Sequence, residues 1–385
     1  MWHSPGPQNS GPMASAEKRV FGLDLLRAVA ITLVLVQHAA ELLVQVPEEW
    51  RCWIHFGRFG VDLFFALSGF LVGGILLRAG PALLQPRLLG GFLVGRWMRT
   101  LPLFYFMLAL RACLRAAADR APADPWRVLG SYAVFTQNLA WPMPAFFVES
   151  WSLSVEEWFY VLLPLLIWAG LRGGLRGPRA LWAGAVILLT VPLLMRCLVS
   201  NAGDQGLDLI GIVVYRLDSI AWGVVGAILA HLRPKWWQSI RAPALAIGLL
   251  VLGVNYAFAG AAPWGAPFAR TFLLSFQGLG MALLLPWASM VRAFGGDWWR
   301  RSVQYVAQLS YSIYLTHLLV AGTLYVHLAY PHPRAGMPER AAWVALFVSI
   351  TLAISATTYR WIEQPALAAR NRIRAYLAFK AALRG

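Results

Sequence analysis

An arginine and a histidine within one apolar stretch are the residues best placed to do chemistry. Arg27 and His38 lie eleven positions apart between Phe21 and Glu41. At about 100° per residue, that spacing brings both side chains to one face of a helix, roughly 16 Å apart along its axis. Charged and titratable groups inside a membrane-spanning helix are costly, and they are functional candidates by default. We therefore interpret Arg27 and His38 as candidate functional residues.

Two carboxylates flank this pair. Asp24 and Glu41 each lie three residues outside it, close to the same helix face. A ladder of buried ion pairs that only fixes helix packing would explain both carboxylates as well as a functional role would. For a histidine that shares a face with an arginine, we favour function.

A second pair of arginines suits an anionic ligand. Arg96 and Arg99 stand at i and i+3, and we expect them at the cytoplasmic mouth of a third membrane span. Two guanidinium groups on one face form a fork that matches phosphate oxygens. From charge alone, an ordinary positive anchor at the membrane surface is the simpler explanation.

Adjacent acids open the expected fourth span, within Glu149-Ser-Trp-Ser-Leu-Ser-Val-Glu-Glu-Trp-Phe-Tyr160. Carboxylates in the first turns of a helix suit its dipole. Two acids beside hydroxyls and aromatic rings exceed what capping needs, so the stretch predicts a polar cavity, which Asn138 could line. The candidate residues of this stretch are Trp151, Ser152, Glu156, Glu157 and Tyr160.

Three further spans carry polar groups. In the second, Asp62 needs a partner, and Arg58 is available one turn away. In the sixth, Arg216 and Asp218 are two residues apart and point in different directions, so we expect each to pair with another helix. In the ninth, a helix-bridging hydrogen bond is a simpler role for His317 than catalysis.

Composition decides the fold class. The chain has 385 residues, of which 59% are hydrophobic and 13% charged, and its mean hydropathy is +0.59. A soluble protein would carry about twice that share of charge, so we predict an all-α polytopic membrane protein. The net charge of +16 is dispersed among apolar stretches, which indicates positive cytoplasmic loops rather than nucleic-acid binding. No cysteine or histidine spacing predicts a metal site.

Apolar stretches long enough to span a bilayer recur about ten times. With the N-terminus inside, the basic residues fall mostly in the inner loops, so both termini are predicted to be cytoplasmic and residues 118–150 to form an outer loop. We expect a disordered cytoplasmic segment at 1–19, an integral-membrane domain at 20–365 and a basic cytoplasmic tail at 366–385. The expected spans are 21–46, 57–78, 97–117, 152–170, 180–200, 209–231, 242–259, 271–292, 303–329 and 340–361.

These motifs together resemble the membrane-bound acyltransferase family 3, whose members O-acylate cell-envelope glycans and other acceptors in bacteria. The resemblance runs from Phe21 to about Pro365. Its elements are Arg27-x10-His38, Arg96-x-x-Arg99, the fourth-span WSLSVEEWFY, Arg216-x-Asp218, the ninth-span YSIYLTH that ends at His317, and the closing YRWIEQP. The chain departs from the family pattern at Trp158, where many members have a polar residue. Some members carry a fused extracellular esterase-like domain, and we expect this protein to act without one.

The resemblance implies an enzyme of the bacterial inner membrane that takes an acyl group, most often acetyl, from cytoplasmic acyl-CoA. The acceptor would be a hydroxyl of an envelope glycan or glycolipid on the outer side. Arg96 and Arg99 would hold the CoA phosphates, and His38 would act as base, oriented by Glu41, Glu156 or Glu157. Arg27 would bind the donor or stabilise the developing oxyanion.

Two other classes fit the intramembrane charges. A transporter could use them as an ion relay, although the chain has neither paired broken helices nor a two-fold internal repeat. A flippase for lipid-linked sugars would fit the acidic and aromatic start of the fourth span. Consumption of an acyl-CoA thioester separates the classes, because transporters and flippases leave the thioester intact.

Overall fold

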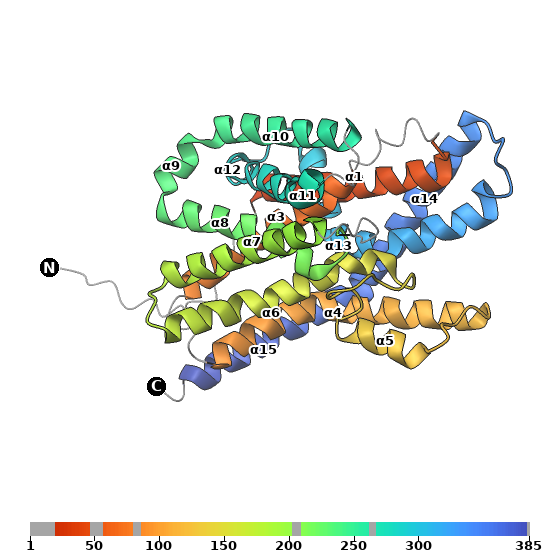
Figure 1. Ribbon diagram of the computed structural model, residues 1–385. Coiled ribbons are helices and arrows are strands. Elements are labelled where there is room, and N and C mark those ends of the chain that lie inside the picture. Colours follow the sequence, from red (N-terminus) through yellow and green to blue (C-terminus); the bar gives the residue numbers. More distant parts are fainter. Residues whose placement is uncertain (1–19, 47–56, 80–85, 202–208, 262–266, 383–385) are drawn as a thin grey trace.

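The computed structural model describes residues 20–46, 57–79, 86–201, 209–261 and 267–382, and within these ranges the regular structure is helical, joined by turns and loops, with no strand (Figure 1). The elements in chain order are α1 (Phe21–Ala39), η1 (Ala40–Val44), α3 (Gly57–Ala79), α4 (Pro86–Ala117), α5 (Pro125–Ala133), η3 (Val148–Ser150), α6 (Trp151–Arg172), α7 (Pro178–Asn201), η4 (Val213–Tyr215), α8 (Leu217–Leu232), α9 (Pro234–Ser239), α10 (Arg241–Ala261), α11 (Pro267–Ala282), α12 (Leu285–Ala288), α13 (Asp297–Leu324), η5 (Tyr325–Ala329), α14 (Met337–Thr358), η6 (Tyr359–Glu363) and α15 (Gln364–Ala382).

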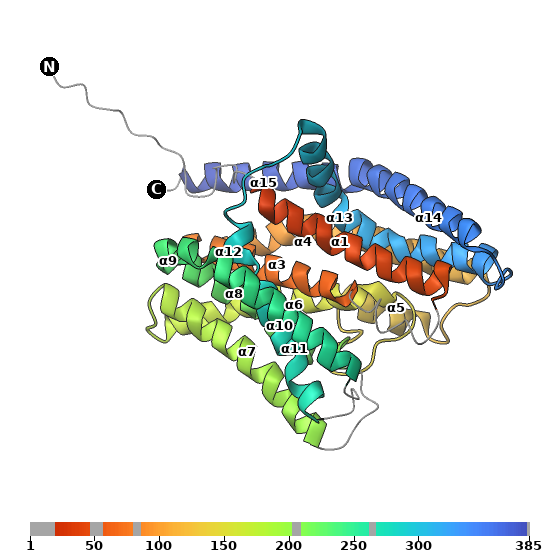
Figure 2. The same ribbon diagram turned by 90° about the horizontal axis from the view of Figure 1, so that it is seen from above.

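Nine segments of the described chain are long and apolar enough to cross a membrane. The expected sixth span corresponds to the shorter apolar helix α8, whose 16 residues are about 24 Å long. The prediction of an all-α polytopic membrane protein is therefore confirmed, with nine long helices and a short one in place of ten full spans. The start of α1 and the end of α15 lie toward the same end of the bundle (Figure 2), as an even number of crossings requires.

The sixth span is short because its outer part is not α-helical. The backbone N–H groups of Val213 and Val214 donate to the carbonyls of Asn138 and Leu139, at 2.9 and 3.2 Å. The Asn138 side chain donates in turn to the carbonyls of Gly211 and Trp151, at 2.6 and 3.1 Å. Irregular backbone at this depth is tolerated because the protein itself supplies its hydrogen bonds. Asn138 therefore supports the start of α8, and it does not line the polar cavity described below.

Small residues bring α3 and α8 into close contact. A Cβ atom at Gly69 would lie 2.0 Å from the carbonyl oxygen of Ile220, and one at Gly223 would lie 2.1 Å from that of Ala66. Only glycine allows the two backbones to approach this closely. These glycines of α3 and α8 therefore fix α8 against the centre of the bundle.

Helix α4 begins at Pro86, earlier than the expected residue 97, because the apolar run before Arg96 is also helical. Arg96 and Arg99 are thus ten and thirteen residues into the helix, roughly 15 and 20 Å along its axis. Both lie within the candidate span Leu89–Ala117, whose 29 residues exceed the roughly 20 that cross a bilayer, so their place at the cytoplasmic mouth of the span stays a prediction.

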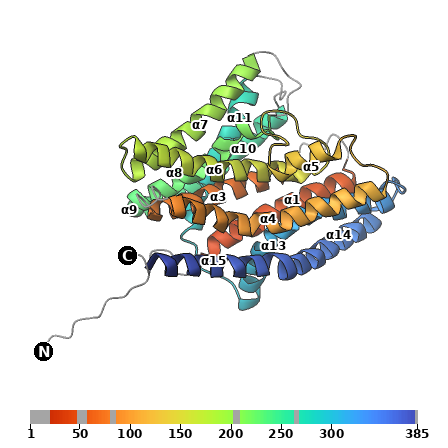
Figure 3. The same cartoon turned by 90° about the horizontal axis from the view of Figure 1, so that it is seen from below.

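Of the two predicted terminal segments, only the C-terminal one lies within the described residues. Segment 1–19 lies outside the described residues. The expected tail continues from η6 as α15, which packs against α4 (Figure 3).

Candidate active site

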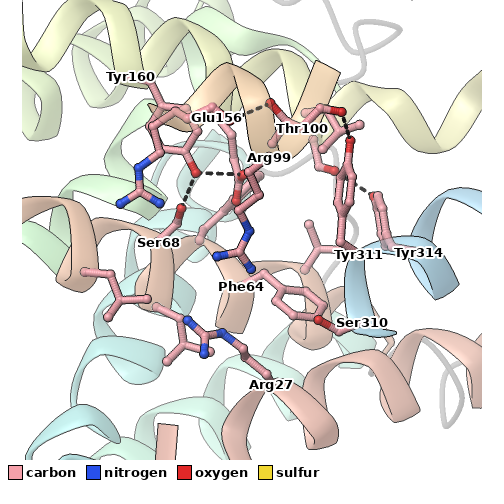
Figure 4. A pocket seen from close by; sticks show the side chains of 17 residues that line it. Arg27, Phe64, Ser68, Arg99, Thr100, Glu156, Tyr160, Ser310, Tyr311 and Tyr314 are labelled. Atoms are coloured by element: carbon pink, nitrogen blue, oxygen red, sulfur yellow. Dashed lines mark hydrogen bonds between the residues drawn. The ribbon is translucent and has the colours of Figure 1, made fainter. Parts of the chain in front are cut away.

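A cavity between α1, α3, α4, α6 and α13 brings together six of the candidate residues, Arg27, Arg96, Arg99, Ser152, Glu156 and Tyr160 (Figure 4). Its volume is about 100 Å³, enough for several water molecules. Its polar lining residues are Arg27, Ser68, Arg96, Arg99, Thr100, Ser152, Glu156, Tyr160, Ser310, Tyr311 and Tyr314. Its apolar lining comes from α3 and α6 and includes Phe64, Phe65 and Leu153.

Three guanidinium groups meet in this cavity. Arg27 and Arg99 reach in from opposite sides, from α1 and α4 (Figure 4). Arg27 forms an ion pair with Asp24 on its own helix, at 3.1 Å. Arg96 stacks over Tyr160, with the guanidinium carbon 5.4 Å from the ring centroid. Arg99 is exposed and makes no hydrogen bond or ion pair within the described ranges, so its five donors can bind an anion.

The carboxyl group of Glu156, which also lines the cavity, is held in place by hydroxyl groups. Tyr160 donates to Glu156 Oε2 at 3.0 Å, and the same phenol lies 2.6 Å from Ser68 Oγ. This chain joins α6 to α3 across the cavity. With three guanidinium groups facing one carboxyl, the cavity favours an anionic ligand.

Two tyrosines of α13 close the cavity. The Tyr311 hydroxyl donates to the Thr100 carbonyl at 2.5 Å. The Tyr314 hydroxyl donates to the Glu149 carbonyl at 2.9 Å and lies 2.7 Å from Ser152 Oγ. The YSIYLTH stretch thus supplies one wall of the cavity, although only its histidine stood out in the sequence.

His38 lies beyond this wall and does not line the cavity. Its Nδ1 is 3.4 Å from Glu41 Oε2, and Gln37 donates to the other oxygen of Glu41 at 2.7 Å. Its ring centroid lies 5.1 Å from that of His317, which in turn is 5.7 Å from Tyr314. Of the three carboxylates considered as partners of His38, Glu41 is the one beside it.

The sequence predicts that His317 bridges two helices through a hydrogen bond, and within the described residues it does not. Its Nδ1 faces the carbonyls of Ile313 and Tyr314 on its own helix, at 3.2 and 2.7 Å. A carbonyl only accepts, so Nδ1 carries the proton and Nε2 has the lone pair. That Nε2 is buried and has no hydrogen-bond partner in the described part of the chain.

The two adjacent acids of α6 face different spaces. Glu156 lines the arginine cavity, whereas Glu157 lines a separate groove between α4 and α6. One step along a helix turns the side chain by about 100°, which explains the separation. Glu157 accepts a hydrogen bond from Thr100 Oγ1 at 2.7 Å, and Thr100 itself belongs to the arginine cavity.

Behind the cavity, buried charges pair across helices, as predicted for the sixth span. Arg216 bonds to Asp62 of α3 at 2.6 Å, and Gln277 of α11 donates to the same carboxylate at 2.5 Å. Asp218 pairs with Arg196 of α7 at 2.6 Å. Breaking one partner of such a buried pair typically costs about 3–5 kcal/mol, so these groups hold α3, α7, α8 and α11 together.

Two paired arginines, the buried Arg196 and the half-buried Arg111, were missed in the sequence. Arg196 supports the start of α8 from an otherwise apolar helix, and Arg111 pairs with Glu149 while its guanidinium lies 4.6 Å from the ring centroid of Phe147. The available signal was the same one that singled out Arg216, a charge in the middle of an apolar run.

Sequence comparisons find relatives that align along most of this chain. The protein YrhL of Bacillus subtilis (strain 168) is 27% identical over 377 residues, which cover 89% of this chain and 54% of that protein. Nodulation protein 10 of Rhizobium leguminosarum bv. viciae is 26% identical, covering 96% of this chain and 98% of that protein. Peptidoglycan O-acetyltransferase OatA of Listeria monocytogenes is 24% identical, covering 91% of this chain and 56% of that protein.

The chain therefore spans about half the length of YrhL and OatA. No solved structure matches it. A family model described as an acyltransferase domain matches residues 20–360, almost the whole described bundle. The chain belongs to this acyltransferase family.

Proposed function

We propose that this protein is an O-acyltransferase of the bacterial inner membrane. It moves an acyl group, in the simplest case acetyl, from cytoplasmic acyl-CoA to a hydroxyl of a cell-envelope glycan or glycolipid. The observation that carries the proposal is the convergence of Arg27, Arg96 and Arg99 on one cavity within the membrane-spanning part. The relative named as a peptidoglycan O-acetyltransferase supports both the acetyl group and the glycan.

The three arginines are assigned to the donor. A CoA thioester carries several phosphates, and guanidinium groups bind phosphate oxygens through paired, charge-assisted hydrogen bonds. Arg99, with no ion pair of its own in the described chain, would contribute most. Arg27 shares this cavity, which favours donor binding over stabilisation of an oxyanion near His38. Because the cavity holds only several water molecules, the donor must displace side chains as it enters.

His38 is assigned the chemistry. Glu41 beside Nδ1 would keep the proton on that nitrogen and leave the Nε2 lone pair for the acceptor. As His38 removes the hydroxyl proton, the acceptor oxygen bonds to the thioester carbon and the carbon–sulfur bond breaks. The departing CoA thiolate then takes the proton from the imidazolium. Tyr314 and His317 lie between the donor cavity and His38, so the thioester must reach past Tyr314.

The decisive experiment measures thiol release. Purified protein in lipid vesicles is supplied with acetyl-CoA and envelope glycan fractions, and free CoA thiol and acetylated glycan are followed together. Release of thiol matched by acetyl transfer supports the proposal. If an active preparation moves glycan or acetyl-CoA across the vesicle and leaves the thioester intact, a transporter or flippase replaces it.

A further inference from the structure

A groove between α4 and α6 has no role in the donor chemistry. Its volume is about 400 Å³, and the end of α5 forms its rim. It is lined by Trp97, Leu101, Tyr105, Ala133, Val134, Phe135, Glu157, Trp158 and Val161. Tyr105 and Val134 are exposed, and since α4 and α6 are both candidate spans, we expect the part of the groove along these two helices to face lipid. Hydrocarbon fits such a lining.

The rim is fixed by hydrogen bonds. The Trp158 indole donates to the Phe135 carbonyl at 2.9 Å, and the Tyr105 hydroxyl donates to the Ala133 carbonyl at 2.8 Å. The groove is therefore preformed, and its shape depends on Trp158 and Tyr105.

A single carboxyl group interrupts the apolar lining. Glu157 is only 5% exposed, and Thr100 holds its Oε1 at 2.7 Å. Its Oε2 is buried and has no hydrogen-bond partner in the described ranges. A buried oxygen without a donor costs free energy, which a ligand hydroxyl at this position would recover.

The carboxyl group of Glu157 also connects the groove to the arginine cavity, in which the donor is proposed to bind. Thr100, which bonds to Glu157, lines the arginine cavity, and its carbonyl accepts the Tyr311 hydroxyl. One threonine thus separates the two spaces. A ligand anchored at Glu157 lies next to the donor without entering among the arginines.

We propose that this groove binds the acyl acceptor as a membrane-resident amphiphile, with its alkyl chain along the apolar wall and one hydroxyl on Glu157. The assignment rests on the proposed function, which requires a hydroxylated acceptor. An anionic headgroup would be repelled by the carboxylate, and a plain hydrocarbon offers it no hydrogen-bond donor. Glu157 is therefore an anchoring residue for the acceptor rather than the base.

Photo-crosslinking in vesicles tests the site without requiring turnover. One probe is an alkyl β-glucoside with a diazirine in its chain, and the other is the same diazirine alkane without the sugar. We expect the glucoside to label peptides that contain Trp97 or Val161. Glu157→Gln keeps the size of the side chain and its contact with Thr100, but it replaces the acceptor Oε2 by an amide N–H donor. It should therefore reduce glucoside labelling of these peptides by roughly tenfold and leave alkane labelling unchanged.

Matched variants at lipid-facing positions complete the test. Val161→Trp fills the groove and should abolish labelling by both probes, whereas Val186→Trp on the lipid-facing side of α7 should change neither. Equal labelling by both probes, insensitive to Glu157→Gln, would mean that ordinary lipid chains occupy the groove and would overturn the inference. Because labelling needs no thioester, a failure of the acyltransfer assay alone would leave this binding site standing.

Discussion

At the scale of single residues, the two histidines differ in what their ring nitrogens contact. His317 is fully buried and tied by Nδ1 to its own helix, while His38 is partly exposed and faces a carboxylate. A carboxylate that accepts from one ring nitrogen orients the imidazole and makes the other nitrogen the base. This contrast favours His38 over His317 as the catalytic group.

Replacing His38 tests this assignment. His38→Ala should lower turnover by a factor of roughly 10² to 10⁴, the usual contribution of a general base, because the acceptor hydroxyl keeps its proton. Binding of a non-hydrolysable acyl-CoA analogue should persist, since the arginines lie elsewhere. His327→Ala, at an exposed histidine of η5, is the control and should behave as the parent. Normal turnover in His38→Ala would contradict the mechanism.

Arg99 is the matching test of donor binding. Arg99→Ala should raise the KM for acetyl-CoA at least tenfold, and Arg99→Lys should restore part of the loss because lysine lacks the planar fork. Arg301→Ala, at an exposed arginine of α13, should leave the KM unchanged. If Arg99→Ala weakens dephospho-CoA thioesters as much as full CoA thioesters, the 3′-phosphate is not its ligand. An unchanged KM for both would return Arg99 to the role of a charged anchor.

The sequence indicates which residues are out of place in a membrane, and four of these candidates, Arg27, Arg96, Arg99 and Glu156, line one cavity in the structure. It does not indicate which neighbour each one meets. Asp62 bonds to Arg216, 154 positions away, and helix periodicity carries no information about that distance in sequence. For the same reason, the position of His38 behind Tyr314 requires the packed structure.

At the scale of elements, close packing and buried ion pairs hold the short α8 in place. Its hydrophobic pattern predicts a full span, but the backbone before Leu217 bonds to the segment around Asn138. Hydropathy registers apolar side chains and does not show where their backbone amides find acceptors. The early start of α4 was missed because Gly90 and Gly91 weaken the helical pattern of the sequence before Arg96.

Two glycines of α3 allow a matched test of this packing. Gly69→Ala places a Cβ 2.0 Å from the Ile220 carbonyl, so the helices must separate, with an expected cost of about 1–3 kcal/mol. At Gly74, five positions further on, a Cβ would meet only the end of the Arg78 side chain, at 3.6 Å. Thermal unfolding in detergent should show a lower Tm for Gly69→Ala and no loss for Gly74→Ala. Equal Tm values would show that α3 and α8 do not need this contact.

Variants of the Arg216–Asp62 pair test whether the protein's stability depends on the buried charges themselves or on their mutual neutralisation. Asp62→Asn or Arg216→Gln alone should destabilise the protein by about 3–5 kcal/mol, because each leaves a buried charge uncompensated. The double variant should be more stable than either single one, since no net charge stays buried. The measurement is again thermal unfolding. If the double variant lost as much stability as the two single variants together, each residue would stabilise the protein through its own contacts and not through the ion pair.

At the scale of the whole molecule, one end of the bundle collects the basic connections. The turns that join α6 to α7 and α8 to α9 lie toward the end at which α15 finishes, and they carry Arg172, Arg176, Arg179 and Arg233 (Figure 1). Cytoplasmic loops carry an excess of Lys and Arg, so this end is assigned to the cytoplasm. Arg96 and Arg99 lie in the half of α4 nearer to it, which is the side from which a CoA donor must come.

Cysteine labelling in intact cells tests this orientation. In a variant without the three native cysteines, Ala123→Cys should react with a membrane-impermeant maleimide, because residue 123 lies exposed in the loop before α5, on the side assigned as outer. Arg176→Cys, exposed between α6 and α7, should react only after the cells are permeabilised. Arg176 is preferable to the neighbouring Gly177, whose φ of +37° disfavours any side chain. The reverse pattern would place the arginine-rich end outside, where no acyl-CoA is available, and would exclude CoA as the donor even if acyl transfer itself were observed.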